Sequence, residues 1–311
     1  MGKKIIITGG LGYIGTELCK IYSGYSWNDE IIVIDKRFIS ERVTQLRNWN
    51  INFVQGDILN KELIKYYCAD ADIIHHLAGI TKVPRVKSES NDQEDKEIKQ
   101  VAEQGTQNIL DVISNNCKII LPSTHVVFEG MKNIKKDILE DEVTAPLLSY
   151  AKSKDYNEKQ LKKSGKNYVI LRLGTIFGTS IGMRFHTAIN KFCWQANFNK
   201  PITVWETALE QRRPYLGIND AVTAIALIIN NNLFNRETYD VVTQNLSVND
   251  VIKVLKSFSE NIDINFVQSK IMNEYSFGVS SIKIEKVGMK FKDSLYEQIS
   301  KTLELLENSN I

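Results

Sequence analysis

The sequence predicts an α/β fold: a doubly wound parallel sheet of the Rossmann type, followed by a smaller, mixed α/β C-terminal lobe. Three observations support this prediction. Short β-branched runs alternate with longer amphipathic stretches through the first half of the 311 residues, which is a repeated βαβ pattern. Runs such as residues 5–7 and 31–34 are apolar throughout, as in parallel strands covered on both faces. A glycine-rich turn, residues 8–15, directly follows the first of these runs.

The periodicity predicts the individual elements in order. Strands are expected at 4–8, 31–35, 52–55, 72–77, 118–121 and 168–171, with helices over most of 88–116 and over 148–163. After about residue 178 the pattern loosens to a helix at 187–196, strands at 202–205 and 213–218, and a helix at 220–230. Ser247 with Asp250 predicts the start of a helix over 248–257, and 295–306 reads as a terminal helix. We expect a cofactor-binding unit at 1–178, with segments near 213–242 packing back on it, and a mainly substrate-binding lobe at 179–311.

Composition limits the partners of the protein. The chain is 43% hydrophobic, and its 39 basic and 37 acidic side chains leave a net charge of +2, which fits a folded protein that binds small molecules. We expect neither nucleic acid nor a membrane as partner, since no long basic block occurs and the longest apolar run, 224–229, is far too short to span a bilayer. The first ten residues lack the apolar core of a signal peptide, so a cytoplasmic location is expected.

Cysteine and histidine spacing argues against a metal site. The four cysteines lie far apart with no CxxC pair, so neither a zinc cluster nor a disulfide framework is expected. The four histidines show no HxxxH or HExxH spacing, and we expect no bound metal.

The glycine turn predicts a phosphate site. Gly9, Gly12 and Gly15 follow a strand and open a helix, whose first N–H groups and positive dipole favour a pyrophosphate. Asp35 ends the second strand 20 residues after Gly15, where a carboxylate accepts hydrogen bonds from both ribose hydroxyls and repels a 2′-phosphate. NAD is therefore favoured over NADP, although Lys36 and Arg37 argue the other way. Asp57 ends the third strand, placed either to accept from the adenine amino group or to cap a turn or helix.

A possible catalytic pair stands on the 148–163 helix. Tyr150 and Lys154 are one helical turn apart, but a chain with 12 tyrosines contains about one YxxxK by chance. The preceding strand supplies context, because Ser123 and Thr124 at its end bring hydroxyls to the carboxyl edge of the sheet, where such folds bind ligands.

Taken together, TGGxGxIG, the acid after the second strand, HLAG at 76–79, the Ser-Thr strand end and YxxxK resemble the extended short-chain dehydrogenase/reductases. More narrowly, the chain resembles the NAD-dependent epimerase/dehydratase family that modifies nucleotide sugars, in particular UDP-glucose 4-epimerase-like members. Residues 171–178 and 213–220 resemble the later LRxxNxxG and RDYIHVxD segments of that family. The resemblance therefore covers essentially the whole chain.

The resemblance implies roles for individual residues. Tyr150 would be the general base or acid, Lys154 would hold the nicotinamide ribose and lower the pKa of the tyrosine, and Thr124 would bind the reacting sugar hydroxyl. It further implies a homodimer in which the helix around 97–113 pairs with the Tyr150 helix in a four-helix bundle. The implied cofactor contacts are Gly9, Gly12, Tyr13, Ile14, Gly15, Asp35, Lys36, Asp57, Ile58, Leu77, Ala78, Gly79, Tyr150 and Lys154.

Physical chemistry constrains that catalytic pair. A free phenol has a pKa near 10, so a base working near pH 7 needs about three units of stabilisation, roughly 4 kcal/mol. An exposed ion pair supplies at most about 1 kcal/mol. Lys154 must therefore act in a desolvated cleft, helped by the positive charge of oxidised nicotinamide.

Several positions depart from the family pattern near the catalytic residues. His125 and Val126 follow Thr124 where the 4,6-dehydratases have Asp-Glu, so the usual acid and base for dehydration are missing. His125 could substitute as an acid, or it could be a structural histidine. Phe128 replaces a frequent tyrosine, and Ala102 replaces an asparagine that serves as a proton relay in relatives.

The residues expected to bind the substrate also depart from the family pattern. Thr175 stands where relatives often use asparagine on the substrate diphosphate, and 273–275 lacks an expected arginine. Arg213 aligns with a phosphate-binding arginine, and Arg184 could add a second guanidinium. For both arginines, a salt bridge to the neighbouring lobe is the alternative. Trp205 stands where an aromatic ring stacks on the nucleotide base, with core packing as the alternative.

The sequence thus predicts an NAD-dependent nucleotide-sugar epimerase that oxidises and re-reduces C4 of the sugar. The same residues are also compatible with a 4-ketoreductase or a C4 dehydrogenase. A non-catalytic module that senses NAD is a further alternative. The sugar and the nucleotide are not predicted.

Overall fold

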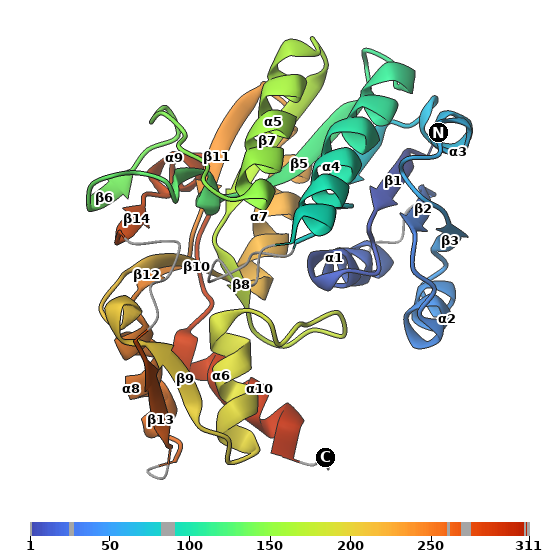
Figure 1. Ribbon diagram of the computed structural model, residues 1–311. Helices are drawn as coiled ribbons and strands as arrows, with labels where there is room; N and C mark the ends of the chain where they lie inside the picture. Colours follow the sequence, from blue (N-terminus) through green and yellow to red (C-terminus); the bar gives the residue numbers. More distant parts are fainter. Residues whose placement is uncertain are drawn as a thin grey trace.

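The computed structural model describes residues 2–24, 28–81, 91–259, 262–268, 275–307 and 309. Its centre is a seven-stranded sheet in the order β11-β7-β5-β4-β1-β2-β3, with every neighbouring pair parallel (Figure 1). The predicted doubly wound α/β fold is confirmed, and all six predicted strands are present. The strands are β1 (Lys4–Thr8), β2 (Glu30–Asp35), β3 (Asn52–Gln55), β4 (Ile73–His76), β5 (Lys118–Thr124), β7 (Asn167–Leu173) and β11 (Glu237–Val241).

Alternate strand residues build two separate apolar layers. In β1, Ile5 and Ile7 join the core beneath α1 (Tyr13–Ser23), α2 (Ser40–Asn48) and α7 (Ile218–Asn230). Ile6 joins the core on the opposite face, beneath α3 (Lys61–Cys68), α4 (Asp92–Val112) and α5 (Ser149–Lys163). Figure 1 shows α4 and α5 lying side by side over that face. The unbroken apolar strands follow from this two-sided burial.

The strand order of the large sheet reverses at β1. β2 and β3 extend the sheet on one side of β1, whereas β4, β5, β7 and β11 extend it on the other. At such a point the loops at the carboxyl ends of β1 and β4 run apart, which opens a crevice. Gly9 follows β1, and Leu77 to Gly79 follow β4, so both segments border that crevice.

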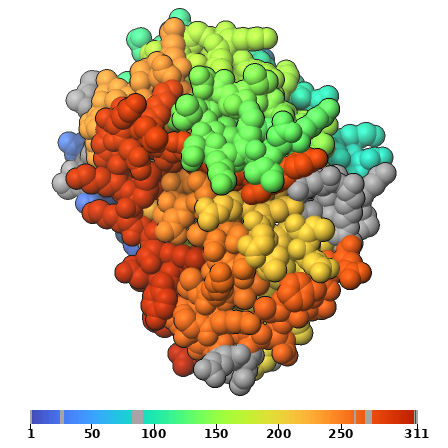
Figure 2. Space-filling view, turned by 90° about the vertical axis from the view of Figure 1, so that its left-hand side faces the viewer, coloured from blue at the N-terminus to red at the C-terminus, as the bar shows by residue number. Residues whose placement is uncertain are grey.

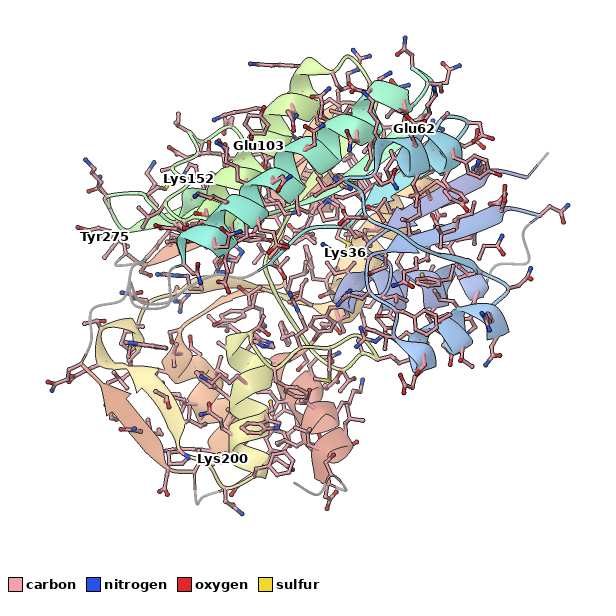
Figure 3. The ribbon with its side chains drawn as sticks, turned by 45° about the vertical axis from the view of Figure 1, so that its right-hand side comes forward. Lys36, Glu62, Glu103, Lys152, Lys200 and Tyr275 are labelled. Atoms are coloured by element: carbon pink, nitrogen blue, oxygen red, sulfur yellow. The ribbon has the colours of Figure 1, made fainter. Side chains whose placement is uncertain are left out.

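The lobe below the sheet has its own apolar core. Its helices α6 (Ala188–Asn197), α8 (Val248–Lys256) and α10 (Leu295–Glu307) pack together, beside the parallel pair β9 (Ile202–Trp205) and β13 (Ile264–Val267) (Figure 1). The predicted start of α8 is confirmed as a capping box between Ser247 and Asp250. Lys200, labelled in Figure 3, lies at the end of the lobe far from the sheet, whereas Lys36 lies centrally, between the strands and the lobe.

Further short sheets complete the structure. β8 (Thr175–Phe177), β10 (Arg213–Gly217) and β12 (Gln244–Leu246) form one, and β6 (Lys135–Ile138) with β14 (Phe277–Val279) forms another. The helix α9 (Ile282–Lys286) packs against β11. In the view of Figure 2 the segment around residues 129–147, in green, lies above and beside the orange and red C-terminal segments.

The structure differs from the expected elements at a few places. The edge strand β11 was not predicted, because its sequence, ETYDV, mixes polar and apolar residues. Of the helix expected over 88–116, α4 covers 92–112, and residues 88–90 lie outside the described part. In the described part of the chain, no helix is both long and apolar enough to cross a membrane. All four cysteines are buried and carry free thiols.

Candidate active site

The glycine turn approaches the β4 loop more closely than a side chain would allow. Gly9 has φ of +71°, and a Cβ there would lie 2.7 Å from the Ala78 backbone. At Gly15 a Cβ would lie 2.6 Å from Gly10 Cα, so α1 begins directly against the turn. Gly12 is the N-cap of α1 and brings no side-chain cap, and the first turn of the helix has no acidic residue. The helix N-terminus therefore keeps its N–H groups available for an anion.

Tyr13 and Ile14 begin α1 but turn their side chains away from that N-terminus. The Tyr13 hydroxyl donates to Gly178 O and accepts from Asn190 Nδ2 at 3.0 Å, and burial raises its pKa. Ile14 packs against the apolar core. What these two residues can offer to a cofactor is therefore the backbone.

Asp35 lies at the end of β2, buried and already hydrogen-bonded. Its Oδ2 accepts from Leu11 N (3.1 Å) and Arg37 Nη2 (3.1 Å), and its Oδ1 accepts from Arg37 N (3.0 Å) and Nε (3.1 Å). Arg37 is mostly exposed, so it can leave without breaking a packed core. A ribose that binds Asp35 through its hydroxyls must displace this guanidinium.

Asp57 takes the capping role, one of the two predicted for it, in this structure. Its Oδ1 caps a turn by accepting from Leu59 N at 2.9 Å, and its Oδ2 lies 3.1 Å from Lys36 Nζ. Ile58, next to it, is buried against Gly105 of α4. This corner lies beyond β2 and β3, on the side of the crevice away from Tyr150.

The segment after β4 is tied to β1. Leu77 N donates to Thr8 O at 3.1 Å and Ala78 N to Thr8 Oγ1 at 3.3 Å. Gly79 is exposed, with open space where a Cβ would stand. These bonds fix the HLAG segment to the glycine turn.

Tyr150, Lys154 and Thr124 come together where α5 packs on β5. Thr124 hydrogen-bonds the Tyr150 hydroxyl, and Lys154 Nζ donates to Pro122 O at 2.8 Å. Pro122 lies beyond Ile120, the last β5 residue paired with β4, so its missing N–H breaks no bond on that side. The strand end thus offers Lys154 a free carbonyl.

The surroundings of the pair set its pKa values. Burial lowers the pKa of Lys154 to about 8, and the Glu158 carboxylate opposes this shift. Burial raises the pKa of Tyr150, while Arg184 and the hydrogen bond from Thr124 lower it and Glu129 raises it further. The desolvated cleft matches the expectation, but the cation that lowers the pKa of Tyr150 here is Arg184, whereas Lys154 is turned to a carbonyl. The resting phenol is therefore a poor base without a further positive charge.

A buried ion pair anchors the catalytic helix to the sheet. Arg172 of β7 donates from Nε and Nη2 to Glu158 of α5, with the shortest contact 2.8 Å, and Ser123 Oγ donates to the same carboxylate at 2.6 Å. Glu158 is not among the residues predicted from the sequence, although a signal for it exists: Tyr150, Lys154 and Glu158 are spaced four apart on one face of the helix.

Glu129 is a second acidic group that the sequence did not point to. It is buried, and its Oε1 accepts from Leu148 N at 2.8 Å, which caps the start of α5. Its charge also acts on Tyr150 and on Arg213. No sequence pattern marks it, because only the folded chain brings residue 129 to the start of the helix.

The predicted substrate residues lie on several segments. Arg213, on β10, stacks its guanidinium on the Phe277 ring at 5.0 Å, and its charge acts on His125. Thr175, on β8, pairs with Tyr215 of β10.

Two further predicted residues come from separate segments. Arg184 is exposed, donates to Thr81 Oγ1, and acts electrostatically on Tyr13, Tyr150 and Arg37, so it stands between the glycine turn and the catalytic tyrosine. Trp205 ends β9 in the lobe, part-buried. Of the segment 273–275, only Tyr275 belongs to the described residues.

His125 is buried and neutral. Its Nδ1 lies 3.0 Å from Leu173 O, its ring packs against Phe277, and burial together with Arg213 lowers its pKa to about 4. A histidine held in this way is a poor proton donor near pH 7. Its environment favours the structural interpretation.

Comparison with known proteins fits this arrangement. The model of the NAD dependent epimerase/dehydratase family matches residues 5–241, and the chain belongs to that family. CDP-paratose 2-epimerase of Salmonella typhi is 29% identical over 85% of this chain and 86% of its own length. dTDP-D-glucose 4,6-dehydratase of Dictyostelium discoideum is 25% identical over 99% of this chain and 82% of its own.

Solved structures agree on the fold. UDP-glucuronic acid 4-epimerase from Bacillus cereus, with UDP-glucuronic acid and NAD bound, superposes with a TM-score of 0.83 at 22% identity over 98% of this chain and 99% of that one. The dTDP-glucose 4,6-dehydratase DesIV from Streptomyces venezuelae, with NAD bound, gives 0.82 at 20% identity over 98% and 97%. The protein is thus a member of an NAD-dependent family of nucleotide-sugar enzymes whose members catalyse more than one reaction.

Proposed function

We propose that this protein is a nucleotide-sugar epimerase that inverts C4 of the sugar by oxidation and re-reduction. The observation that carries the proposal is the set formed by Thr124, Tyr150 and Lys154 at the crevice, without an acid and base pair directly after Thr124. Such a cycle leaves no net change in oxidation state.

The residues at the crevice fit the cofactor of the family. The turn at Gly9, which has no side chain, and the open N-terminus of α1 suit a pyrophosphate, and Asp35 suits ribose hydroxyls once Arg37 moves away. We infer that Gly9, Gly12, Gly15 and the backbone of Tyr13 and Ile14 hold the diphosphate. Lys36, Asp57 and Ile58 border the adenine end, and Leu77, Ala78 and Gly79 border the nicotinamide half. NAD, when bound, supplies a hydride acceptor and donor together with a positive ring.

Tyr150 is the proton acceptor in this proposal. It takes the proton of the C4 hydroxyl, Thr124 holds that hydroxyl in place, and Tyr150 returns the proton after the sugar has turned over. Because burial raises its pKa, the phenol loses its proton only when a positive charge lies close by. Lys154, held at Pro122 O, is within one helical turn and orients the nicotinamide ribose.

Dehydration is disfavoured by the groups that follow Thr124. Val126 has no acid–base group, and His125 is neutral with one ring nitrogen at a backbone carbonyl. Glu129 is a carboxylate, but one of its oxygens caps α5. These contacts support a reaction that needs only the tyrosine as acid and base.

We infer that Arg213, Arg184, Thr175 and Trp205 bind the nucleotide diphosphate portion of the substrate. The Glu129 carboxylate acts electrostatically on both Arg213 and Tyr150, and Arg184 acts on Tyr150 directly. Two guanidinium groups suit a diphosphate. In this division residues 1–178, with 213–242 returning to them, serve the cofactor, and 179–311 mainly serve the substrate.

We also propose a cytoplasmic homodimer that uses the outer faces of α4 and α5. Figure 3 shows Glu103 of α4 and Lys152 of α5 on this helix layer. α4 carries six acidic and two basic side chains, α5 carries five lysines and two acids, and the exposed Tyr156 lies on α5. A twofold arrangement would place the acidic helix of one copy on the basic helix of the other. Light scattering tests this: a dimer that Lys152→Glu weakens supports it, and a monomer at every concentration contradicts it.

A panel of UDP-, dTDP- and CDP-sugars tests the reaction. The proposal expects C4 interconversion of at least one sugar without a net absorbance change of NADH. A steady absorbance change would instead show a 4-ketoreductase or a C4 dehydrogenase, which the same three residues permit. Absence of any sugar conversion, with NAD bound, would contradict the proposal and favour a module that senses NAD.

A further inference from the structure

Asn157 is a buried amide on the catalytic helix, three residues after Lys154. One of its two terminal atoms faces two carbonyl oxygens, Ala102 O at 3.0 Å and Ser153 O at 3.3 Å, and is therefore the nitrogen. The amide oxygen accepts from Thr106 Oγ1 at 3.1 Å. Asn157 thus joins α5 to α4 at two points.

The contacts continue from Thr106 to the glycine turn. Thr106 Oγ1 lies 3.0 Å from His76 Nε2, and His76 Nδ1 lies 2.9 Å from Thr8 Oγ1. Thr8 Oγ1 in turn accepts from Ala78 N at 3.3 Å. None of the four side chains is more than 4% exposed. We call Thr8, His76, Thr106 and Asn157 the buried chain.

The proton order along the buried chain follows from its two ends. A hydroxyl has one proton, and Thr106 gives its proton to Asn157, so it accepts from His76 Nε2–H. His76 Nδ1 is then bare and accepts the proton of Thr8, whose oxygen accepts from Ala78 N–H. All hydrogen bonds of the buried chain then run in the same direction. They start at Ala78 N–H, beside Gly9, and end at the Ser153 carbonyl of the catalytic helix. Burial and the nearby Lys154 lower the pKa of His76 to about 3, so the ring is neutral at pH 7.

We propose that Asn157 is a positioning residue, which through the buried chain sets the distance between the glycine turn and the Tyr150–Lys154 helix. The inference builds on the proposed function, since the reaction requires that cofactor and phenol be held in register. Both ends of the chain lie beside the working groups: Ala78 contacts Gly9, and Ser153 precedes Lys154. A shift of about 1 Å between reacting groups costs about 100-fold in rate.

Asn157→Leu tests the proposal, because leucine keeps the volume and removes the amide. Gln160→Leu is the matched control: Gln160 also sends its amide from α5 to α4, to Glu103 O at 3.4 Å and Gln107 Oε1 at 2.9 Å, but has no link to His76. We expect Asn157→Leu to lower kcat about 10- to 100-fold with KM within about threefold. Gln160→Leu should keep kcat within about twofold. Equal kcat values for the two variants would overturn the proposal.

Thr106→Val provides a second variant of unchanged shape in case Asn157→Leu does not fold. It breaks the buried chain on both sides of Thr106, and we expect the same fall in kcat. A wild-type kcat in Thr106→Val would also overturn the proposal.

The tautomer of His76 gives a readout that needs no substrate. In protein labelled with ¹⁵N-histidine, the ring shifts of His76 should show the Nε2–H tautomer. In Asn157→Leu the Thr106 hydroxyl is free to donate to Nε2, so the Nδ1–H form should appear, whereas Gln160→Leu should resemble the wild type. An Nδ1–H tautomer in the wild type would refute the buried chain, whatever reaction the enzyme catalyses.

Discussion

The two halves of the crevice are held by different forces. On the cofactor side the backbone shapes the site, through the left-handed Gly9, the close contact at Gly15 and the open end of α1. On the catalytic side buried charges dominate, among them Lys154 and Glu158 on the buried face of α5. We therefore expect cofactor affinity to depend on shape and turnover to depend on buried electrostatics. Substitutions that change one property without the other test this comparison.

The largest expected effect on stability comes from the ion pair beneath α5. Glu158→Leu removes one partner and leaves the Arg172 guanidinium buried, which costs about 3–5 kcal/mol of unfolding free energy. Lys162 contacts the same carboxylate at 3.6 Å but is largely exposed, so Lys162→Ala should cost less than about 1 kcal/mol. Urea unfolding of both variants makes the measurement. A small loss in Glu158→Leu would mean that charge does not anchor the catalytic helix.

The next effect concerns the shape of the cofactor side. Gly9→Val adds a side chain at φ of +71° and 2.7 Å from the Ala78 backbone, and should weaken NAD binding about 100-fold, equal to about 2.7 kcal/mol. Gly165→Val is the control: Gly165 has the same φ of +71° with nothing within 4 Å of a Cβ, and it precedes β7, at the end of the strand away from the crevice. Titration of NAD by fluorescence quenching compares the two. Unchanged affinity in Gly9→Val would place the diphosphate elsewhere.

An effect that is smaller per pH unit should appear as acid sensitivity. Burial lowers the pKa of His75 and of His76 to about 3, against 6.5 in the unfolded chain, so both stay neutral when folded. Below pH 6.5 the unfolded chain binds protons that the folded chain does not, and stability falls until about pH 3. Each histidine adds up to about 1.4 kcal/mol per pH unit, and His75→Phe should flatten the slope by that amount. Chemical unfolding between pH 7 and 4 measures it, with the exposed His186→Asn as control.

The smallest expected effect is a gain. Asp240 of β11 is fully buried, neither carboxylate oxygen has a hydrogen-bond partner among the described residues, and burial raises its pKa well above the usual value. A raised pKa of a carboxyl means that stability is lost as pH rises above about 4, so Asp240 weakens the fold at pH 7. Asp240→Asn should add about 1 kcal/mol to the unfolding free energy at pH 7. The exposed Glu237→Gln, on the same strand, should change it by less than about 0.5 kcal/mol.

Much of the fold was predictable because its signals are local. The apolar strands, the glycine turn with Asp35, and the capping box at Ser247 each lie within one short segment, and all are present as expected. β11 escaped prediction because an edge strand has a weaker apolar pattern. Long-range packing decides the rest. Glu129 hydrogen-bonds the start of α5 only once the helices and the sheet have assembled. The same holds for the hydrogen bonds of Asn157 with Ala102 and Thr106.

The catalytic set was predictable as residue types but not as electrostatics. YxxxK after a Ser-Thr strand end marked Tyr150, Lys154 and Thr124. The pattern gave no indication that Lys154 would turn to Pro122 O while Arg184 lowers the pKa of the phenol. Arg184 comes from a segment 34 residues further on, and no spacing rule connects the two.

Turnover of nucleotide sugars by Tyr150→Phe, with NAD binding measured in the same samples, tests the central claim most directly. Tyr156→Phe is the matched control, one turn and a half further along the same helix and exposed to solvent. We predict that Tyr150→Phe loses about 10²- to 10⁴-fold in turnover while binding NAD as tightly as Tyr156→Phe. Full turnover in Tyr150→Phe would contradict the assignment of this phenol as the proton acceptor, and with it the proposed epimerase chemistry.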